Sequence, residues 1–398
     1  MRAVVFHGIG DIRLDEVPEP QIEEATDAIV RLTASAICGT DLHMVRGTLP
    51  GMEPGTILGH EGVGIVEELG DDVRNFDIGD RVVICSTIAC GTCLFCRGGH
   101  YSQCDRANPH GPAAGTAFFG GPRLTGPFHG LQAELARIPF ANVGMVKLPD
   151  EITDDQAILL SDIFPTGYFA ADLADIHPGR TVAVFGCGPV GQFAIASAKL
   201  MDAGRILAID CIDSRLEMAR AQGAEVIDFE KEDPVEAILR LTTGMGVDCA
   251  IDAVGVDAVR RHDGAGGGER FARELQEIAP EQNPQGENWH PGDAPSQAVT
   301  WAVQALCKAG NLSIVGVYPQ SATVFPLGLA MGKNLTIRMG NCDHRRYVPI
   351  LVELVVSGQA DPTRILTQLE PLSSAVEAYR AFDTRQPRWV KVELQPGM

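Results

Sequence analysis

The sequence is poor in basic residues: 32 Lys and Arg against 52 Asp and Glu give its 398 residues a formal charge of −20. A surface of this charge repels phosphate backbones, so we expect no nucleic-acid partner. We also expect no secretory signal, because the opening apolar stretch is short and Asp11 follows soon after. We therefore expect a cytoplasmic location.

Long uninterrupted apolar runs are also missing. The stretch from Thr181 to Ala198 carries no charge, but three glycines and a proline interrupt it. This pattern indicates a strand, a glycine turn and a buried helix, so we expect no membrane partner. Of the 11 cysteines, six lie outside the two metal-binding groups described below, which suits a reducing compartment better than an oxidising one.

The chain is long enough for two ordinary domains. Its first 160 or so residues contain short runs typical of strands, at Ala3–Phe6, Ala28–Ala34, Gly62–Leu69 and Arg81–Ile84. After Pro165 short apolar strands follow one another, most of them separated by helical or charged segments, at Thr181–Phe185, Arg205–Asp210, Glu225–Asp228, Asp248–Asp252 and Asn311–Val317. This alternation predicts βαβ units and a doubly wound parallel sheet, so the fold class is α/β.

An insertion at about 256–296 breaks this alternation. It is rich in Gly, Pro and charged residues, with one helical piece in which Phe271, Leu275 and Ile278 share a face. Connections in βαβ units usually span about 2–6 residues, so this insertion is either functional or mobile.

Four cysteines lie within fifteen residues, in Cys90-Gly-Thr-Cys93-Leu-Phe-Cys96 and at Cys104. We call this segment, about 90–104, the cysteine loop. Four thiolates at this spacing can enclose one zinc ion and leave no open coordination position, so we expect a structural zinc. Disulfides or an iron–sulfur cluster are the alternatives, and disulfides fit poorly in a chain without a secretory signal.

A second group of metal-ligand residue types precedes the cysteine loop. Cys38 and His60 are suitable zinc ligands, although either residue alone would more often belong to a core. Their surroundings add weight: Cys38-Gly-Thr-Asp-Leu-His43, then Gly59-His60-Glu61-x-x-Gly64, Gly70 and Val73. With the cysteine loop about thirty residues on, the pattern resembles the zinc-containing medium-chain alcohol dehydrogenases.

The resemblance implies a GroES-like, mainly-β catalytic domain over residues 1–163 and a Rossmann NAD-binding domain over 164–338. Residues 339–398 are then expected to return to the catalytic domain. It also implies a homo-oligomer, either a dimer or a tetramer. In this family Cys38 and His60 would bind a catalytic zinc, and Glu61 would act beside it as a second-shell or transient ligand. Together with the structural zinc of the cysteine loop, the resemblance implies two zinc ions per chain.

A catalytic zinc needs a third protein ligand and one open position. Many relatives use a cysteine at the entry to the cofactor domain, but Leu160-Ser-Asp162-Ile-Phe-Pro-Thr-Gly-Tyr168 contains none. The formaldehyde dehydrogenase and dismutase branch carries a similar run, in which the aspartate binds zinc. Asp162 is therefore expected to be the third ligand; the alternative is that it caps the following helix. Glutathione-dependent formaldehyde dehydrogenases use a third cysteine, which argues against a glutathione adduct as substrate.

A dinucleotide fingerprint follows the strand Thr181–Phe185. Its hexamer reads Gly186-Cys-Gly188-Pro189-Val190-Gly191, and alone it would be weak; between a strand and a helix it favours pyrophosphate binding. Asp210 ends the next strand, where a carboxylate accepts the ribose 2′-hydroxyl, so NAD is expected. Arg215 either contacts the adenosine end or is a solvated helix charge. By resemblance, Gly316 and Val317 would lie beside the nicotinamide.

The proton path is expected to begin at Thr40, which would accept the hydroxyl proton of the substrate. His43 matches the histidine that hands this proton to solvent in many family members; otherwise it is a packing residue. Three functions stay open: an NAD-linked zinc dehydrogenase acting on a small alcohol or aldehyde, possibly formaldehyde; an aldehyde dismutase that retains its NAD; and a zinc-stabilised nucleotide-binding protein without catalysis.

Overall fold

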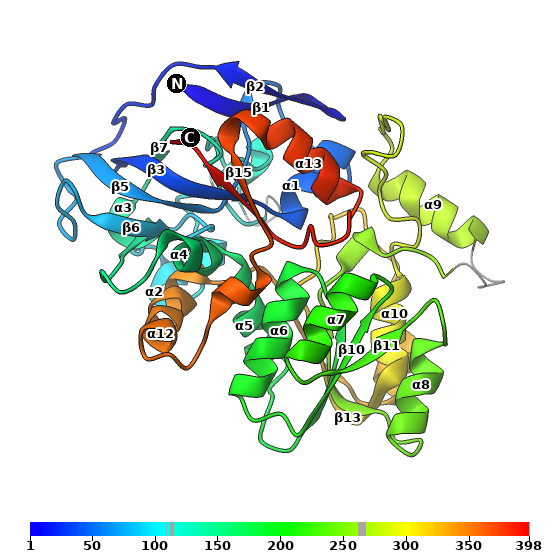
Figure 1. Ribbon diagram of the computed structural model, residues 1–398. Helices are drawn as coiled ribbons and strands as arrows, with labels where there is room; N and C mark the ends of the chain where they lie inside the picture. Colours follow the sequence, from blue (N-terminus) through cyan, green and yellow to red (C-terminus); the bar gives the residue numbers. More distant parts are fainter. Residues whose placement is uncertain (109, 112–114, 262–267, 398) are drawn as a thin grey trace. The chain divides into compact units, whose positions relative to one another are not determined.

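The computed structural model describes residues 1–108, 110–111, 115–261 and 268–397 (Figure 1). The chain divides into two compact units. Unit 1 comprises Met1–Pro165, Glu281–Trp289 and Cys342–Met398, and unit 2 comprises Thr166–Pro280 and His290–Asn341. The predicted insertion at 256–296 is thus divided: residues 281–289 belong to unit 1, not to the nucleotide-binding part, and residues 262–267 lie outside the described residues.

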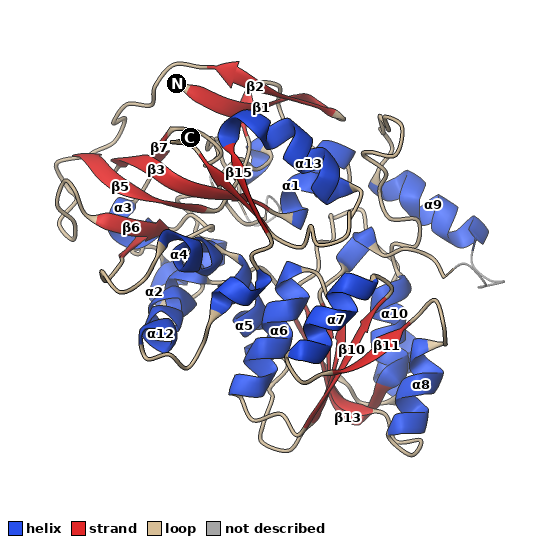
Figure 2. Ribbon diagram, in the orientation of Figure 1, coloured by secondary structure: helices blue, strands red, loops and turns tan. Residues whose placement is uncertain are grey.

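Unit 1 is built on two mainly antiparallel sheets (Figure 2). The smaller has the order β2-β1-β4, and the larger has the order β15-β16-β3-β5-β6-β8, with β7 also paired to β3. Their strands are β1 Arg2–Gly8, β2 Asp11–Glu16, β3 Ala28–Ile37, β4 Thr56–Ile57, β5 Gly62–Leu69, β6 Arg81–Ile84, β7 Leu135–Ile138, β8 Met145–Lys147, β15 Gln368–Pro371 and β16 Val392–Gln395.

Short helices connect these strands. They are α1 Gly39–Arg46, α2 Leu94–Arg97, η1 Tyr101–Gln103, η3 Arg123–Thr125, α3 Ala141–Gly144, α4 Asp154–Ser161, α12 His344–Val356, η5 Pro362–Ile365, η6 Leu372–Ser374 and α13 Ala375–Asp383. Helix α4 begins with a capping box, in which the Thr153 hydroxyl accepts from Gln156 N–H and the Gln156 side chain accepts from Thr153 N–H. This cap fixes the start of the helix that ends next to Asp162.

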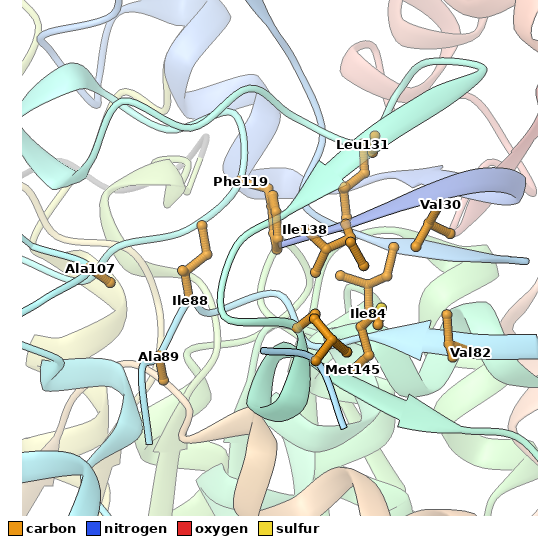
Figure 3. Close-up of a cluster of buried hydrophobic side chains, with 14 of the residues drawn as sticks. Val30, Val82, Ile84, Ile88, Ala89, Ala107, Phe119, Leu131, Ile138 and Met145 are labelled. Carbon is orange, nitrogen blue, oxygen red and sulfur yellow. The ribbon is translucent and has the colours of Figure 1, made fainter. Parts of the chain in front are cut away.

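The core of unit 1 lies between its strands and the cysteine loop. Figure 3 shows strand residues such as Val30, Val82, Ile84 and Met145 packed together, each completely buried. The same cluster contains Cys90, Cys96 and Cys104. The cysteine loop is therefore attached to the main core of unit 1 and does not project as an independent hairpin.

Glu393 is a buried carboxyl of β16 with few partners. It is 1% exposed, Gln395 Nε2 donates to its Oε1 over 3.1 Å, and its Oε2 has no hydrogen-bond partner. Burial raises the pKa of Glu393 from 4.5 to about 7. A raised folded-state pKa adds stability below pH 4.5, and that stability is lost as the pH rises through about 7.

Glu393→Gln should therefore stabilise the protein at pH 8, because it removes a buried charge. We expect a gain on the order of 1–3 kcal/mol in the free energy of unfolding at pH 8, and no gain near pH 4.5. Thermal unfolding midpoints of both proteins at the two pH values measure this. An equal difference between the two unfolding midpoints at both pH values would contradict the explanation.

Unit 2 is a parallel sheet with the order β11-β10-β9-β12-β13-β14. Its strands are β9 Thr181–Phe185, β10 Arg205–Asp210, β11 Glu225–Asp228, β12 Val247–Asp252, β13 Leu306–Ile314 and β14 Thr336–Met339. Its helices are α5 Ile163–Leu173, which begins in unit 1, α6 Pro189–Leu200, α7 Asp213–Ala221, α8 Pro234–Leu241, η4 Gly255–Asp257, α9 Gly268–Ile278, α10 Gln297–Ala305 and α11 Leu327–Gly332. The strand order reverses between β9 and β12, as in a doubly wound nucleotide-binding fold.

The predicted α/β fold class is confirmed, with a mainly-β part followed by a parallel sheet. One strand is shifted: β13 ends at Ile314, whereas the sequence predicted a strand over 311–317. Across the part of the chain that the structure describes, we find no helix whose length and apolar character would let it span a bilayer.

Candidate functional site

Four side chains of unit 1 converge to form a buried group of metal-ligand types. Cys38, His60, Glu61 and Asp162 each offer one ligand atom, and these atoms all lie within 4.8 Å of one another. All four residues are buried. We call them the open donor group. The sequence analysis had placed these residues together only by resemblance; the structure brings them together from three separate segments.

Cys38 occupies the N-cap of α1, directly after β3. Asp41, in the first turn of this helix, accepts a hydrogen bond from Cys38 N–H over 2.9 Å. Burial raises the pKa of the Cys38 thiol. Because a metal binds the thiolate, metal binding at Cys38 would release a proton.

His60 lies between β4 and β5, and its ring is held from two sides. Its Nδ1 lies 3.1 Å from Asp41 Oδ1, and its Nε2 lies 3.4 Å from Asp162 Oδ2. The Phe118 ring packs edge-on against it, with centroids 6.0 Å apart. A carboxylate on Nδ1 fixes the tautomer that leaves Nε2 free to bind a metal. Asp41 therefore orients both Cys38 and His60.

Asp162 connects the end of α4 to the start of α5. Its Oδ2 faces His60 and also lies 3.7 Å from Cys38 Sγ, while its Oδ1 lies 2.7 Å from His344 Nε2. Burial alone would raise the pKa of Asp162, but hydrogen bonds from His344 and His60 outweigh it and hold that pKa well below the ordinary value. Asp162 is thus a carboxylate ready to bind a cation.

Glu61 completes the group and is paired with a lysine. Lys391 Nζ, which is completely buried, donates to Glu61 Oε1 over 2.5 Å and to Ile37 O over 3.0 Å. Burial alone would lower the pKa of Lys391, but the charge of Glu61 raises it. The other oxygen of Glu61, Oε2, is buried and has no hydrogen-bond partner.

The open donor group fits a zinc ion. One thiolate, one imidazole and one carboxylate form a ligand set that zinc prefers, and the unpartnered Glu61 Oε2 suits an occasional fourth ligand. Three ligands from this group would leave a position for a substrate oxygen. A zinc ion in this group would keep an open coordination position, whereas the four thiolates of the cysteine loop would leave none.

Thr40 and His43 both lie in α1, the helix that begins after Cys38. Thr40 is half-buried, and His43 is 4% exposed with its Nδ1 2.7 Å from Thr48 Oγ1. Thr48 also donates to His43 O over 3.3 Å. Thr48 is completely buried and contacts both the ring and the carbonyl of His43, so it holds the imidazole in place.

The cysteine loop forms the second donor group. The sulfur atoms of Cys90, Cys93, Cys96 and Cys104 all lie within 4.8 Å of one another, and none of the eleven cysteines, all of which the structure describes, forms a disulfide. Backbone N–H groups point at these sulfurs: Cys90 Sγ accepts from Cys93 N over 3.3 Å and from Thr92 N over 3.4 Å. Burial would raise the pKa of Cys90, but the hydrogen bonds from Thr92 and Cys93 lower it to about 6.

Cys96→Ser should therefore remove one zinc ion per chain and destabilise unit 1. We expect at least about 3 kcal/mol of lost stability, because binding of a structural zinc contributes directly to folding. Metal analysis and hydrogen exchange of residues 90–107 measure the two effects. Cys85→Ala is the matched control: Cys85 is a buried thiol outside both donor groups, with its pKa raised by burial to about 12. Unchanged zinc content in Cys96→Ser would contradict the assignment.

The glycine hexamer of unit 2 forms a tight turn between β9 and α6. Gly186 has φ +88°, and an added Cβ at Gly191 would lie 1.8 Å from Gly186 O. Gly188 is the N-cap of α6, and Pro189 and Val190 form its first turn. The turn thus presents a helix N-terminus that no side chain obstructs at these positions, and such a terminus attracts phosphate.

Asp210 ends β10 and is already bonded to the backbone around it. Its Oδ2 accepts from Cys187 N over 2.7 Å, and its Oδ1 accepts from Cys211 N over 2.8 Å and Ile212 N over 3.0 Å. The carboxylate therefore ties the glycine turn to the end of β10. Arg215, in α7, lies near the same turn: an added Cβ at Gly188 would be 3.7 Å from its Nη1.

Gly316 and Val317 follow β13 at the same edge of the sheet. Val317 O accepts from Val256 N over 3.0 Å, and an added Cβ at Gly316 would lie 2.2 Å from Gly255 N. Tyr318 donates to Asp252 Oδ2 over 2.6 Å, and this bond holds the ends of β12 and β13 together. All the predicted nucleotide-binding residues of unit 2 therefore lie at the carboxyl ends of parallel strands or in the turns and helices that follow, where this fold binds ligands.

Three residues around the open donor group had escaped the sequence analysis: Asp41, His344 and Lys391. Asp41 could have been found, because it lies three residues after Cys38 in a helix start, where acidic residues cap the chain. His344 and Lys391 lie 182 and 330 residues away from their partners, and no local pattern marks them.

Comparison with known proteins agrees with this geometry. Residues 24–150 match the family described as alcohol dehydrogenase GroES-like domain, and residues 189–262 match the family described as zinc-binding dehydrogenase. The chain is 38% identical over 399 residues to the uncharacterized zinc-type alcohol dehydrogenase-like protein AdhB of Bacillus subtilis strain 168, covering 100% of both chains. It is 33% identical to the glutathione-independent formaldehyde dehydrogenase of Pseudomonas aeruginosa strain LESB58, covering 97% of this chain and 96% of that one.

Among solved structures, the alcohol dehydrogenase TADH from Thermus sp. ATN1 is similar over 99% of both chains, with a TM-score of 0.80 and 34% sequence identity. Similarity of this extent covers both units and both donor groups. The chain belongs to the zinc-type medium-chain alcohol dehydrogenase family.

Proposed function

We propose that this chain transfers a hydride between a small alcohol or hydrated aldehyde, with formaldehyde as the first candidate, and NAD. The observation that carries the proposal is the open donor group: Cys38, His60 and Asp162 offer three zinc ligands and leave one position for substrate. Zinc bound there would polarise the substrate oxygen as a Lewis acid. The second zinc of the chain would be structural and held by the cysteine loop.

Side chains of α1 would then move the proton. Thr40 accepts the hydroxyl proton of the substrate, and His43 hands it on to solvent, with its ring held by Thr48 Oγ1 2.7 Å from Nδ1. A positioned proton acceptor contributes roughly 10²–10⁴-fold to a rate. Thr40 and His43 are therefore the proposed catalytic residues, with Glu61 beside the metal.

NAD is the proposed hydride acceptor, in preference to NADP. Gly186, Gly188 and Gly191 leave room for the pyrophosphate at the N-terminus of α6. Asp210 lies at the end of β10, where a carboxylate accepts the ribose 2′-hydroxyl and repels a 2′-phosphate. Arg215 near Gly188 would contact the adenosine end, and Gly316 and Val317 would border the nicotinamide.

Formaldehyde is favoured by the aspartate at position 162 and by the 33% identity to a glutathione-independent formaldehyde dehydrogenase. Asp162 stands where many relatives have a cysteine, and the chain resembles the formaldehyde dehydrogenase branch in this segment. These two points support a small aldehyde without a glutathione adduct.

An aldehyde dismutase that retains its NAD is the second candidate, and the insertion favours it. Helix α9 of the insertion lies in unit 2, whereas residues 281–289 are anchored in unit 1: Trp289 is 1% exposed and its N–H donates to Asp383 Oδ2 over 2.7 Å. Some members of the formaldehyde dehydrogenase branch carry an insertion at this point in the chain that covers the dinucleotide and holds it tightly, and this resemblance supports the dismutase.

The deciding experiment measures formaldehyde turnover with and without added NAD and glutathione, following NADH, formate and methanol. NADH and formate formed only with added NAD, and without glutathione, support the dehydrogenase. Equal formate and methanol without added NAD support the dismutase. A protein that holds two zinc ions per chain but converts no alcohol or aldehyde would refute both.

A further inference from the structure

His344 is a buried residue next to Asp162 that comes from a distant part of the chain. It is the first residue of α12 and is 2% exposed. The residue before it, Asp343, accepts a hydrogen bond from Ser102 N over 2.7 Å, so the start of α12 is attached to the segment of the cysteine loop. The position of the His344 ring is therefore set by the fold of unit 1.

The two oxygens of Asp162 have different surroundings. Oδ2 faces the open donor group, 3.4 Å from His60 Nε2 and 3.7 Å from Cys38 Sγ. Oδ1 lies 2.7 Å from His344 Nε2. His344 is not a member of either donor group among the described residues. It contacts the oxygen of Asp162 that the metal would not use.

The direction of this hydrogen bond follows from the chemistry of the two groups. A carboxylate only accepts, so Nε2 of His344 must donate to Asp162 Oδ1. In a neutral imidazole the other nitrogen, Nδ1, then accepts. Thr87 Oγ1 lies 3.2 Å from this nitrogen and 3.4 Å from Cys342 O, and its single hydrogen can donate to one of the two at a time. The Thr87 hydroxyl thus contacts the ring at the nitrogen opposite Asp162, and Asp162 itself requires the hydrogen to be on Nε2.

We propose that His344 is a positioning residue, which holds Asp162 so that only Oδ2 binds the catalytic metal. This inference rests on the proposed function, because it assumes a metal in the open donor group. A carboxylate that can rotate can bind zinc through both oxygens and occupy the position that the substrate needs. A hydrogen bond of 2.7 Å to Oδ1 opposes that rotation. Outer partners of metal ligands commonly act in this way.

The test compares metal binding by three variants of this site. His344→Leu removes the donor, Thr87→Val removes the hydroxyl that contacts the other side of the ring, and His344→Gln keeps a donor near the position of Nε2. His129→Gln serves as control for the loss of a histidine, since His129 is an exposed histidine whose Nδ1 accepts from Ile57 N and which lies outside both donor groups. The readouts are the zinc dissociation constant of the open site by chelator competition, and the visible spectrum after cobalt is exchanged into that site alone.

His344→Leu should weaken metal binding at the open site by on the order of 10–100-fold and change the cobalt spectrum. The zinc dissociation constant of His344→Gln should lie closer to that of the wild type. The constant of Thr87→Val should lie between those of His344→Leu and His344→Gln. Wild-type affinity and spectrum in both His344→Leu and Thr87→Val would overturn the inference while leaving the proposed function intact. A wild-type protein that binds one metal, at the cysteine loop only, would refute the proposed function itself and the inference with it.

Discussion

An Asp162→Ala variant should lose the metal of the open donor group and keep less than about one-thousandth of the wild-type turnover. The reason is that a metal contributes more free energy to catalysis than a side chain can. Zinc can lower the pKa of a bound water from about 15.7 to about 7, which corresponds to on the order of 12 kcal/mol. A positioned base contributes only roughly 3–5 kcal/mol. The remaining side chains therefore cannot replace the metal.

Asp162→Cys provides the matched control for this loss. Many relatives have a cysteine as third ligand, and a thiolate at this position offers zinc a suitable donor. We expect one zinc ion per chain in Asp162→Ala, held by the cysteine loop, and two in Asp162→Cys. Metal analysis and the rate of NADH formation measure both results. Two zinc ions and full turnover in Asp162→Ala would show that Asp162 caps a helix and does not bind the metal.

The sequence indicated those parts of the site whose residues are close together in the chain. The cysteine loop and the glycine hexamer each lie within one loop, so their spacing alone suggests what they bind. The hexamer lies in the predicted turn, with Gly188 as the N-cap of α6. Asp162 was identified from the run around it, because the resemblance aligned that run with a ligand position.

Contacts between distant residues could not be found in this way. His344 reaches Asp162 across 182 residues and Lys391 reaches Glu61 across 330, and only the tertiary fold brings each pair together. The end of β13 likewise could not be predicted from the sequence. Its apolar pattern continues through Val317, but Gly316 passes so close to Gly255 that the chain leaves the sheet. Patterns of apolar residues do not report such close approaches.

The insertion was only partly predictable. Its composition indicated a break in the alternation of strands and helices, and the face shared by Phe271, Leu275 and Ile278 corresponds to α9, Gly268–Ile278. Nothing in the sequence showed that residues 281–289 join unit 1. Trp289 is a single large apolar residue among polar ones, and its burial in the core near Tyr379 and Phe382 depends on distant segments.

The second large effect concerns Lys391, whose charge compensates Glu61. Lys391→Met should lower the free energy of unfolding by about 3–5 kcal/mol at pH 8, because it leaves a buried carboxylate without its counter-charge. Both side chains are completely buried, so water cannot replace the lost ammonium group. Burial already raises the pKa of Glu61. Removing the lysine should raise that pKa further, since a nearby positive charge favours the ionised carboxyl.

This pKa direction determines how the effect depends on pH. A carboxyl with a raised folded-state pKa costs the protein stability as the pH rises from its unfolded-state pKa through the raised one, and costs nothing when it is protonated in both states. The destabilisation of Lys391→Met should therefore be large at pH 8 and smaller at pH 5. Thermal and urea unfolding of the wild type and the variant at both pH values measure it.

The double variant Glu61→Gln/Lys391→Met separates the lost charge from the lost packing. It removes both charges, and Gln keeps nearly the shape of Glu, so most of the stability lost in Lys391→Met should return. If the double variant were as unstable as Lys391→Met, the loss would come from the methylene stem of the lysine and from its bond to Ile37 O. A full recovery would instead show that Lys391 stabilises unit 1 mainly as the counter-charge of Glu61, next to the proposed metal ligands.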